Sequence, residues 1–249
     1  MKKLVSIILF ALSLISLLSL TSCSKAEIDI TNKDNVYTDL SDWIINSKNY
    51  TGKTVALTST YTVVYNFDEN KIIRHTLSEP DESGKKRALY EISKSDGNYP
   101  AIGSEVTIIG TLNEGRYIAV DSISGKENKS EFDIDTLDMS AAELKNFVET
   151  YRNQYTDSEA HDKTIRIFGH LSNHENYYFL IGLDGAGKYT WELELYDPTG
   201  KLTYPTAEGT TVNPVQIIGK LSTYEEDNII YACIEVEDVA RVESVFKSE

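Results

Sequence analysis

The spacing of hydrophobic residues changes twice along the chain, from the 3.6-residue period of a helix to the two-residue period of a strand. Before the second change, Ser140 and Glu143 stand in the order of a capping box, which predicts the start of a helix. The apolar stripe that follows has the spacing of one helical face: Leu144, Phe147, Val148 and Tyr151. A shorter stripe in residues 40–44 predicts a similar helix before the first change.

Alternating apolar and polar residues follow each predicted helix and indicate five strands in each half of the chain. The first half has runs near residues 53–67, 71–78, 87–94, 104–112 and 117–124. The second half has runs at 165–171, 177–183, 191–195, 215–221 and 230–236. In the run 177–183 we expect Tyr177, Phe179, Ile181 and Leu183 to face the core, and Tyr178 to face outward.

Four short motifs recur in the same order in the two halves, and each match alone is weak. They are Asp39-Leu40-Ser41 with Asp138-Met139-Ser140, Gly52-Lys53-Thr54-Val55 with Asp162-Lys163-Thr164-Ile165, Tyr99-Pro100 with Tyr204-Pro205, and residues 106–112 with 215–221. Four matches in one order predict a duplicated structural unit.

Five antiparallel strands with a long first strand can close into a small barrel, and glycines within strands, such as Gly169 and Gly219, suit its tight coiling. The Lys-Thr-aliphatic opening and the Val-x-Ile-Ile-Gly fourth strand resemble the OB-fold, and more narrowly the tandem OB-like modules of uncharacterised bacterial lipoproteins. This resemblance implies a mainly β fold of two tandem five-stranded OB-like barrels, each preceded by a short helix. Residues 95–103 are too few for the helix that often follows strand three, and a two-sheet sandwich is the alternative.

The N-terminus has the features of an export signal. A cationic start is followed by an uncharged run, residues 4–20, which is too short for a typical transmembrane helix. The run ends in Leu20-Thr21-Ser22-Cys23, which resembles the bacterial lipobox. The resemblance implies cleavage before Cys23, a lipid on its sulfur, and an extracytoplasmic protein anchored in the cell membrane or the outer membrane. The alternative is an ordinary secretory signal with a chance cysteine.

These patterns divide the chain into five parts. We expect a lipoprotein signal peptide in residues 1–22, a tether in 23–36, a helix with the first barrel in 37–124, a linker in 125–133, and a helix with the second barrel in 134–249.

The formal net charge of −15 argues against a nucleic-acid partner, because phosphate binding depends on Lys and Arg. Loss of residues 1–22 removes two lysines and takes the charge to −17. Only two cysteines are present, which excludes a disulfide scaffold. With Cys23 lipidated, Cys233 is the free thiol, and its apolar and acidic neighbours indicate a structural strand residue.

The sequence has no phosphate loop, HExxH motif or EF-hand loop. His161, His170 and His174 are close together, but no cysteine or fixed carboxylate completes a metal site, so we predict no metal and no cofactor. Glu192 and Glu194 share one face of a strand, where an acid–base pair for glycan cleavage is possible but a solvated surface is the favoured interpretation. We therefore predict no catalytic residues.

The 16 tyrosines are the better indication of a ligand site. Phe168, Tyr178 and Tyr196 fall on the side of their strands opposite the predicted core. OB barrels bind ligands on the outer face of strands two and three, where rings can stack on sugars or bases. The alternative is that these rings pack against the helix or the other barrel.

Together these features predict a lipid-anchored binding or adaptor protein, not an enzyme, whose ligand is a protein or a polysaccharide. A surface glycan hydrolase is the first alternative, and it requires a carboxylate with a raised pKa in a cleft. Extracellular nucleic-acid binding is the second alternative, which the fold suggests and the charge opposes.

Overall fold

The computed structural model describes residues 28–31, 46–80, 86–128, 131–155, 159–174, 177–184, 187–202 and 213–245. The predicted signal peptide, the lipidation site Cys23 and the predicted first helix in residues 40–44 lie outside these ranges. Among the residues that are described, no helix has the length and apolar character needed to cross a membrane.

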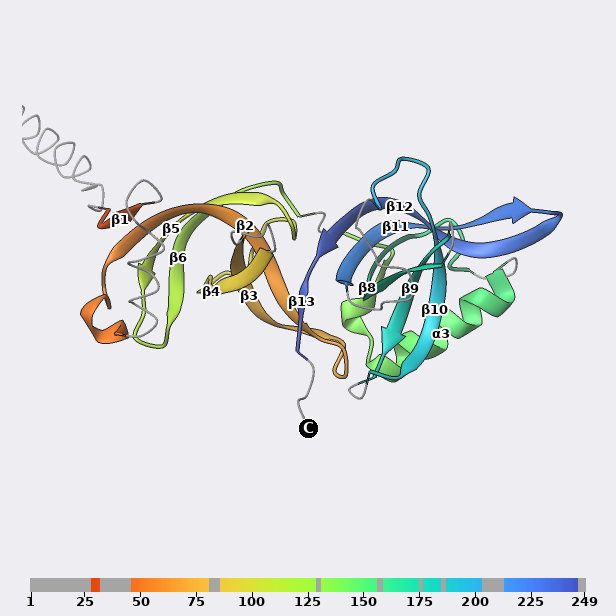
Figure 1. Cartoon of the computed structure of the whole chain (residues 1–249), viewed down its shortest axis with the longest axis horizontal. Coiled ribbons are helices and arrows are strands. Elements are labelled where there is room, and N and C mark those ends of the chain that lie inside the picture. The colour runs from red at the N-terminus through yellow and green to blue at the C-terminus, as the bar shows by residue number, and fades with distance from the viewer. Residues whose placement is uncertain are drawn as a thin grey trace, which may run out of the picture.

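The first barrel is a closed ring of five strands (Figure 1). They are β2 (Thr54–Asn66), β3 (Lys71–Pro80), β4 (Lys86–Ser93), β5 (Glu105–Leu112) and β6 (Tyr117–Ser124). The order around the ring is β2-β3-β4-β6-β5, and β5 pairs back to β2. Every pair in the ring is antiparallel except β4 with β6. A 3-10 turn, η1 (Ser47–Asn49), precedes β2.

The second barrel repeats this topology with β8 (Thr164–His174), β9 (Tyr177–Leu183), β10 (Tyr189–Tyr196), β11 (Asn213–Glu226) and β12 (Ile229–Arg241). Its ring order is β8-β9-β10-β12-β11, with β11 paired back to β8 and β10 parallel to β12. The ring closure in both halves confirms the predicted class: mainly β, with two tandem five-stranded OB-like barrels instead of a sandwich.

The helix before the second barrel forms as predicted and is α3 (Ala141–Gln154). Its capping box is complete, because the Ser140 hydroxyl accepts from the Glu143 N–H at 3.3 Å and the Glu143 carboxylate accepts from the Ser140 N–H at 2.8 Å. The buried face of α3 packs against β10 and β12, and the Tyr151 hydroxyl donates to the Ser222 carbonyl at 3.0 Å. The short turn η2 (Thr136–Asp138) leads into α3.

The duplicated Ile-Ile-Gly motif has one structural role in both barrels. A β-bulge falls at Gly110 between β5 and β6, and another falls at Gly219 between β11 and β12. A Cβ at Gly110 would lie 2.5 Å from the Ala119 carbonyl oxygen, and one at Gly219 would lie 2.4 Å from that of Glu235. Glycine is therefore required at both bulges because the neighbouring backbone approaches so closely.

A fifth repeated motif was missed in the sequence. The two-residue strand β1 (Ile30–Thr31) runs parallel to β2, and β7 (Ile134–Asp135) runs parallel to β8. Beside each strand an aspartate accepts from the first backbone N–H of the barrel, Asp29 from Thr54 at 2.7 Å and Asp133 from Thr164 at 2.8 Å. The sequence signal is Ile28-Asp29-Ile30 against Phe132-Asp133-Ile134, and β1 lies inside the range expected to be a tether.

The predicted orientation of β9 is wrong. Tyr178, Leu180 and Gly182 pair with the core residues Leu195, Leu193 and Trp191, so the even-numbered side chains face the barrel interior. Gly182 leaves room for the indole of Trp191, because a Cβ there would lie 2.2 Å from its Nε1. Both faces of β9 are apolar, which is why alternation alone misplaced the interior.

The two barrels share an aromatic contact. Phe168 on β8 is fully buried and stacks on Tyr65 of β2 with ring centroids 4.3 Å apart and planes 7° apart. Beside it, Phe67 of the first barrel covers His170 with a centroid distance of 4.3 Å. Phe168 packs with the core of the first barrel although it belongs to a strand of the second.

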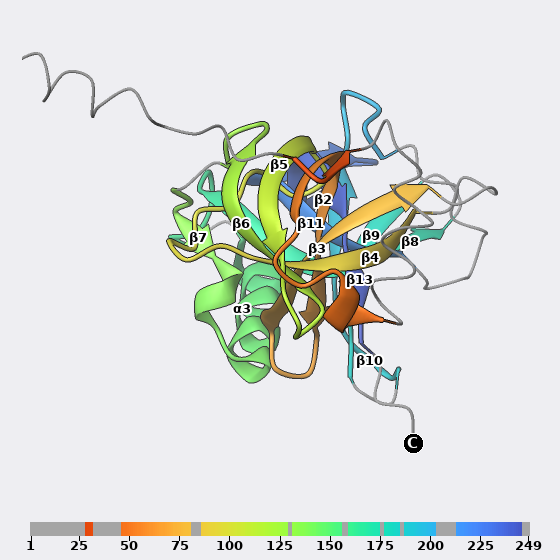
Figure 2. The same cartoon turned by 90° about the vertical axis from the view of Figure 1, so that its left-hand side faces the viewer.

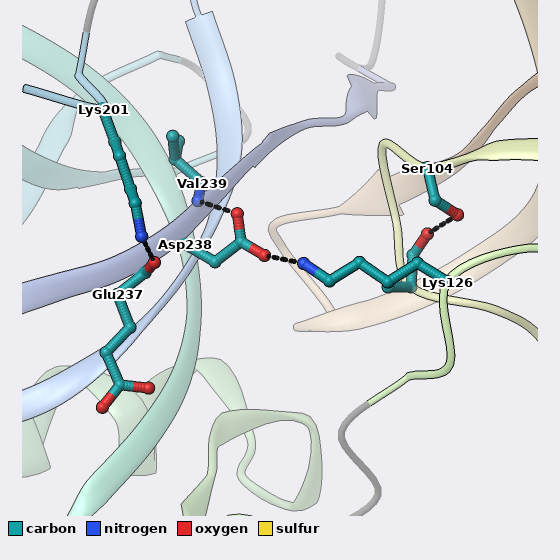
Figure 3. A network of polar contacts seen from close by, with 7 residues as sticks. Ser104, Lys126, Lys201, Glu237, Asp238 and Val239 are labelled. Carbon is teal, nitrogen blue, oxygen red and sulfur yellow. Dashed lines mark hydrogen bonds and ion pairs between the residues drawn. The ribbon is translucent and has the colours of Figure 1, made fainter.

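Polar contacts and one strand also join the barrels, which lie side by side in Figure 1 and one behind the other in Figure 2. The buried Asn70 amide donates to the Met139 carbonyl at 2.7 Å. The C-terminal strand β13 (Glu243–Ser244) runs parallel to β2 and extends the first sheet. Lys126 and Asp238 form an ion pair of 2.7 Å across the boundary, as Figure 3 shows.

Candidate functional site

Two adjoining clefts lie on the second barrel, one of about 580 Å³ and one of about 550 Å³. Glu194 of β10 lines both clefts, so its side chain stands where they meet. Strand register explains the placement, because Glu192 and Glu194 pair with Ile181 and Phe179 on the face of β9 and β10 that points away from the core. We call this surface the tyrosine–glutamate groove and define it by Tyr177, Tyr189, Glu192, Glu194, Tyr196, Tyr224, Glu226 and Tyr231.

Each glutamate of the groove accepts a hydrogen bond from a tyrosine hydroxyl. Tyr177 donates to both carboxylate oxygens of Glu226, at 2.8 and 2.7 Å. Tyr224 donates to Glu194 in the same way. Tyr189 donates to Glu192 on the side of the groove near α3. These bonds fix the carboxylates against ring edges and leave further oxygen lone pairs available to a ligand.

The three glutamates differ in how their charge is balanced. Glu192 forms an ion pair of 2.8 Å with Arg152 of α3. Within the described part of the chain, no lysine or arginine pairs with Glu194 or Glu226. Burial raises the pKa of Glu194; the Tyr224 hydrogen bond acts in the opposite direction, and the charges of Glu226 and Glu192 raise the pKa further. Negative charge is therefore concentrated at the centre of the groove without a cation beside it.

The hydroxyls of Tyr177 and Tyr224 are protonated donors at physiological pH. The hydrogen bond to Glu226 raises the pKa of Tyr177 to about 12. Burial and the bond to Glu194 raise the pKa of Tyr224 from its ordinary value. Each of these hydroxyls donates its one proton to a carboxylate, so the groove presents acceptor oxygens and ring faces to a ligand.

Three of the rings form a stack along one wall. Tyr196 and Tyr224 lie with centroids 5.9 Å apart and planes 12° apart, and Tyr224 and Tyr231 with centroids 5.3 Å apart and planes 19° apart. The outermost ring, Tyr196, is 45% exposed, and Tyr189 is 48% exposed at the opposite end of β10. Ring faces are thus open at both ends of the strand.

The groove ends at the β11–β12 hairpin, which projects from the end of the second barrel that is away from the first (Figure 1). Asp227 and Asn228 turn the hairpin with φ values of 51° and 63°, as a type I′ turn requires. Ile229 and Ile230 follow the turn and are 53% and 47% exposed. The Tyr155 hydroxyl on the segment after α3 donates to the Ile230 carbonyl at 3.1 Å and so ties β12 to that segment just after the turn.

The three predicted ligand-binding aromatics have different positions. Tyr196 and Tyr178 both line the cleft of about 550 Å³, although Tyr178 reaches it from the core side of β9. Phe168 does not belong to the groove, because it is fully buried against Tyr65 of the first barrel. This packing matches the alternative stated above, in which a ring that points away from the core of its own barrel contacts the other barrel.

Sequence reasoning missed Tyr177, which was expected in the core, and also Tyr224 and Glu226. A signal existed in the two-residue alternation of Tyr224 with Glu226, which mirrors that of Glu192, Glu194 and Tyr196. Both sets put aromatic and acidic side chains on one face of a strand.

The other candidate residues do not converge on a chemical site. His170 is buried beneath Phe67, His174 lines the cleft near α3, and His161 lies 4.0 Å from Asp162. Over the residues that are described, no three His, Cys, Asp or Glu side chains are placed to hold a metal ion. Cys233 is buried on β12, in keeping with a structural role.

No protein-family model matches the chain, and no curated protein matches it. Among solved structures, a deletion mutant of the single-stranded DNA binding protein from Thermus aquaticus matches with 14% sequence identity and a TM-score of 0.23. That match covers 80% of this chain and 98% of the other. The fold follows from the strand pairing within each barrel.

Proposed function

We propose that the protein is a lipid-anchored extracytoplasmic binding or adaptor protein whose ligand is a protein or a polysaccharide. The observation that carries the proposal is the tyrosine–glutamate groove, which combines open ring faces with fixed acceptor oxygens. It lies over the outer face of the second and third strands of its barrel, where OB-folds bind oligomeric ligands, and includes residues from β11 and β12. The anchoring part of the proposal rests on the lipobox-like sequence at Cys23.

The groove suits an extended ligand better than a compact one. Its two clefts lie on either side of Glu194, and the exposed rings Tyr189 and Tyr196 stand at the two ends of β10. An extended chain lying along β10 would contact both rings and pass over the carboxylates between them. Stacking on ring faces tolerates many ligands, whereas the fixed acceptors select those with donor groups.

Binding is tested with residues 24–249, which lack the signal peptide and the lipidated cysteine. Titration calorimetry against soluble glycans and purified envelope proteins measures affinity for this form and for Tyr196→Ala. Removal of one stacking ring should weaken binding by about 1–3 kcal/mol. Tyr117→Ala, on β6 of the first barrel, is the matched control and should bind as the parent does. Equal affinity in both variants would place the ligand site outside the groove.

Anchoring is tested separately by substituting Cys23→Ser and fractionating the cells. The substitution removes the proposed acceptor of the lipid, so the protein should leave the membrane pellet. A variant that remains in the pellet to the same extent as the parent would refute the lipoprotein assignment.

Glycan hydrolysis is a second candidate, and the raised pKa of Glu194 in the groove favours it. A carboxyl with a raised pKa suits a general acid, and Glu192 lies two positions along the same strand. The assay is release of reducing ends from envelope polysaccharides, with Glu194→Gln as the inactive variant. Binding without hydrolysis in the parent protein would leave the adaptor function as the better description.

Nucleic-acid binding is the weakest candidate, because Glu192, Glu194 and Glu226 line the face that would have to receive phosphates. Oligonucleotides therefore serve as the negative ligand in the same titrations.

A further inference from the structure

Resting on the proposed binding function, we infer that the tyrosine–glutamate groove binds an extended, lysine-bearing segment of a partner protein, with a lysine ammonium group at Glu194. A cationic chain can balance the charge of the groove carboxylates, which neutral and anionic chains cannot do. Four features of the described residues support this choice.

The first feature is unbalanced charge. Glu194 is half-buried and faces Glu226 and Glu192, yet among the described residues only Glu192 has a cationic partner, Arg152 at 2.8 Å. A ligand ammonium at Glu194 would supply the missing positive charge and relieve the repulsion from Glu226. The same carboxylates repel an anionic ligand, and a neutral glycan leaves the repulsion in place.

The second feature is the ring stack of Tyr196, Tyr224 and Tyr231. Ring faces attract cations, and ammonium groups bind between aromatic rings and carboxylates in known cation sites. Tyr224 also donates its hydroxyl proton to Glu194, so the ring and the carboxylate are already fixed together. Tyr196 and Tyr231 cover the two faces of Tyr224, so a cation at Glu194 would contact the carboxylate directly and lie beside the exposed ring of Tyr196.

The third feature is depth. Glu194 lies at the junction of the two clefts and is flanked by Tyr224, so it is recessed below the exposed Tyr196. A lysine has a long alkyl stem that packs on apolar ring surface and a charged end that reaches past it. An amine attached directly to a sugar ring has no such stem, which is why we choose a polypeptide over an amino-sugar chain.

The fourth feature is length. Tyr189 and Tyr196 bound the 8-residue strand β10, which at about 3.3 Å per residue puts them roughly 23 Å apart. A fully extended peptide of about seven residues spans that distance. Ile229 and Ile230 at the projecting hairpin add an apolar contact beside the groove. The net charge of −15 would also accelerate the approach of a basic segment.

The test is fluorescence anisotropy of labelled eight-residue peptides with residues 24–249 at two salt concentrations. One peptide alternates lysine with serine, and a second carries acetyl-lysine at the same positions. Chitosan and neutral chitin oligomers of matched length are competitors. We expect the lysine peptide to bind at least about tenfold more tightly than its acetylated form, and chitosan to compete poorly.

Single substitutions distinguish binding in the groove from a general attraction between a basic peptide and an acidic protein. Glu194→Gln and the exposed Glu226→Gln should each weaken lysine-peptide binding about tenfold. Glu105→Gln, on the exposed face of β5 in the first barrel, changes the net charge equally and should alter affinity by less than about twofold. Because Glu226 is exposed, its substitution keeps the test valid even if Glu194→Gln fails to fold.

Four results would overturn the inference. Equal binding of the lysine and acetyl-lysine peptides would refute the need for a cation. Equal losses of lysine-peptide affinity in Glu226→Gln and Glu105→Gln would show that the binding depends only on the overall charge of the protein. If a neutral glycan or chitosan binds more tightly and Tyr196→Ala abolishes that binding, the lysine assignment fails and the proposed function survives. If no polymer binds the groove at all, both fail.

Discussion

Replacing Phe168 with alanine is expected to destabilise the first barrel, although Phe168 belongs to a strand of the second. Its ring is fully buried, packs with the first core and stacks on Tyr65 with a centroid distance of 4.3 Å. Truncating a fully buried phenylalanine to alanine costs about 3–5 kcal/mol through lost transfer energy and the cavity left behind. The first barrel should bear most of this loss, because the cavity opens beside Tyr65.

Hydrogen exchange followed by mass spectrometry locates the loss along the chain. Peptides from β2 and β6 should lose protection by roughly a hundredfold or more, since about 3 kcal/mol corresponds to that factor. Phe147→Ala on α3 is the matched control, because Phe147 packs only against the second core and is partly buried. The control should lower the protection of peptides from β10 and β12 and leave the exchange of β2 unchanged. Unchanged exchange in β2 of Phe168→Ala would show that this contact does not couple the barrels.

Three further outcomes are expected. Gly219→Ala should lower the free energy of unfolding by about 1–3 kcal/mol in urea titrations, because its Cβ would lie 2.4 Å from the Glu235 carbonyl oxygen; an unchanged midpoint would contradict this. Burial raises the pKa of Cys233 to about 12, so a thiol reagent at pH 8 should react only in denaturant, and rapid reaction in native buffer would refute it. Burial lowers the pKa of His75 and of His170 to about 4. Each histidine should therefore lower the free energy of unfolding by ~1.4 kcal/mol per pH unit as the pH falls from 6.5 toward 4. Equal free energies of unfolding at pH 7.5 and 5 would disprove that loss.

The strands and the duplication were predictable because they depend on local alternation and on short motifs. The Ile-Ile-Gly motif is repeated in sequence and has the same bulge in both barrels, at Gly110 and Gly219. The capping box at Ser140 and Glu143 is equally local, and it formed as predicted. Each of these features is set by residues only a few positions apart.

The orientation of β9 was not predictable from alternation, because its outer face is also apolar. Ile181 points away from the core, but it pairs with His170, and Phe67 of the first barrel covers that position. The second half of β9 is buried on both faces, so it has no polar side to mark the solvent. The interior is instead set by Gly182, which makes room for Trp191.

The groove was predictable only in part. Tyr196 stands on the outer face of the third strand as expected, but its neighbours Tyr224 and Tyr231 come from β11 and β12. The register between β10 and β12 brings them together, and no local pattern fixes pairing between strands so far apart in sequence. Pairing of β13 with β2 is non-local for the same reason.

The duplication also makes the first barrel an internal comparison for the proposed site. On its second and third strands Thr76 pairs with Glu91, and the Glu91 carboxylate lies 3.8 Å from the Arg74 guanidinium. The corresponding face of the second barrel instead has Glu194 bonded to a tyrosine hydroxyl, with no arginine beside it among the described residues. The shared topology therefore does not by itself produce a carboxylate bonded to a tyrosine at this position, and the substituted side chains do. The first barrel contributes by packing: its Phe67 covers His170, on the same side of β8 as His174, which lines the cleft of about 580 Å³. A ligand that needs unbalanced negative charge should accordingly bind one barrel of the pair, giving one site per chain in titration calorimetry, and two equivalent sites would contradict this division of roles.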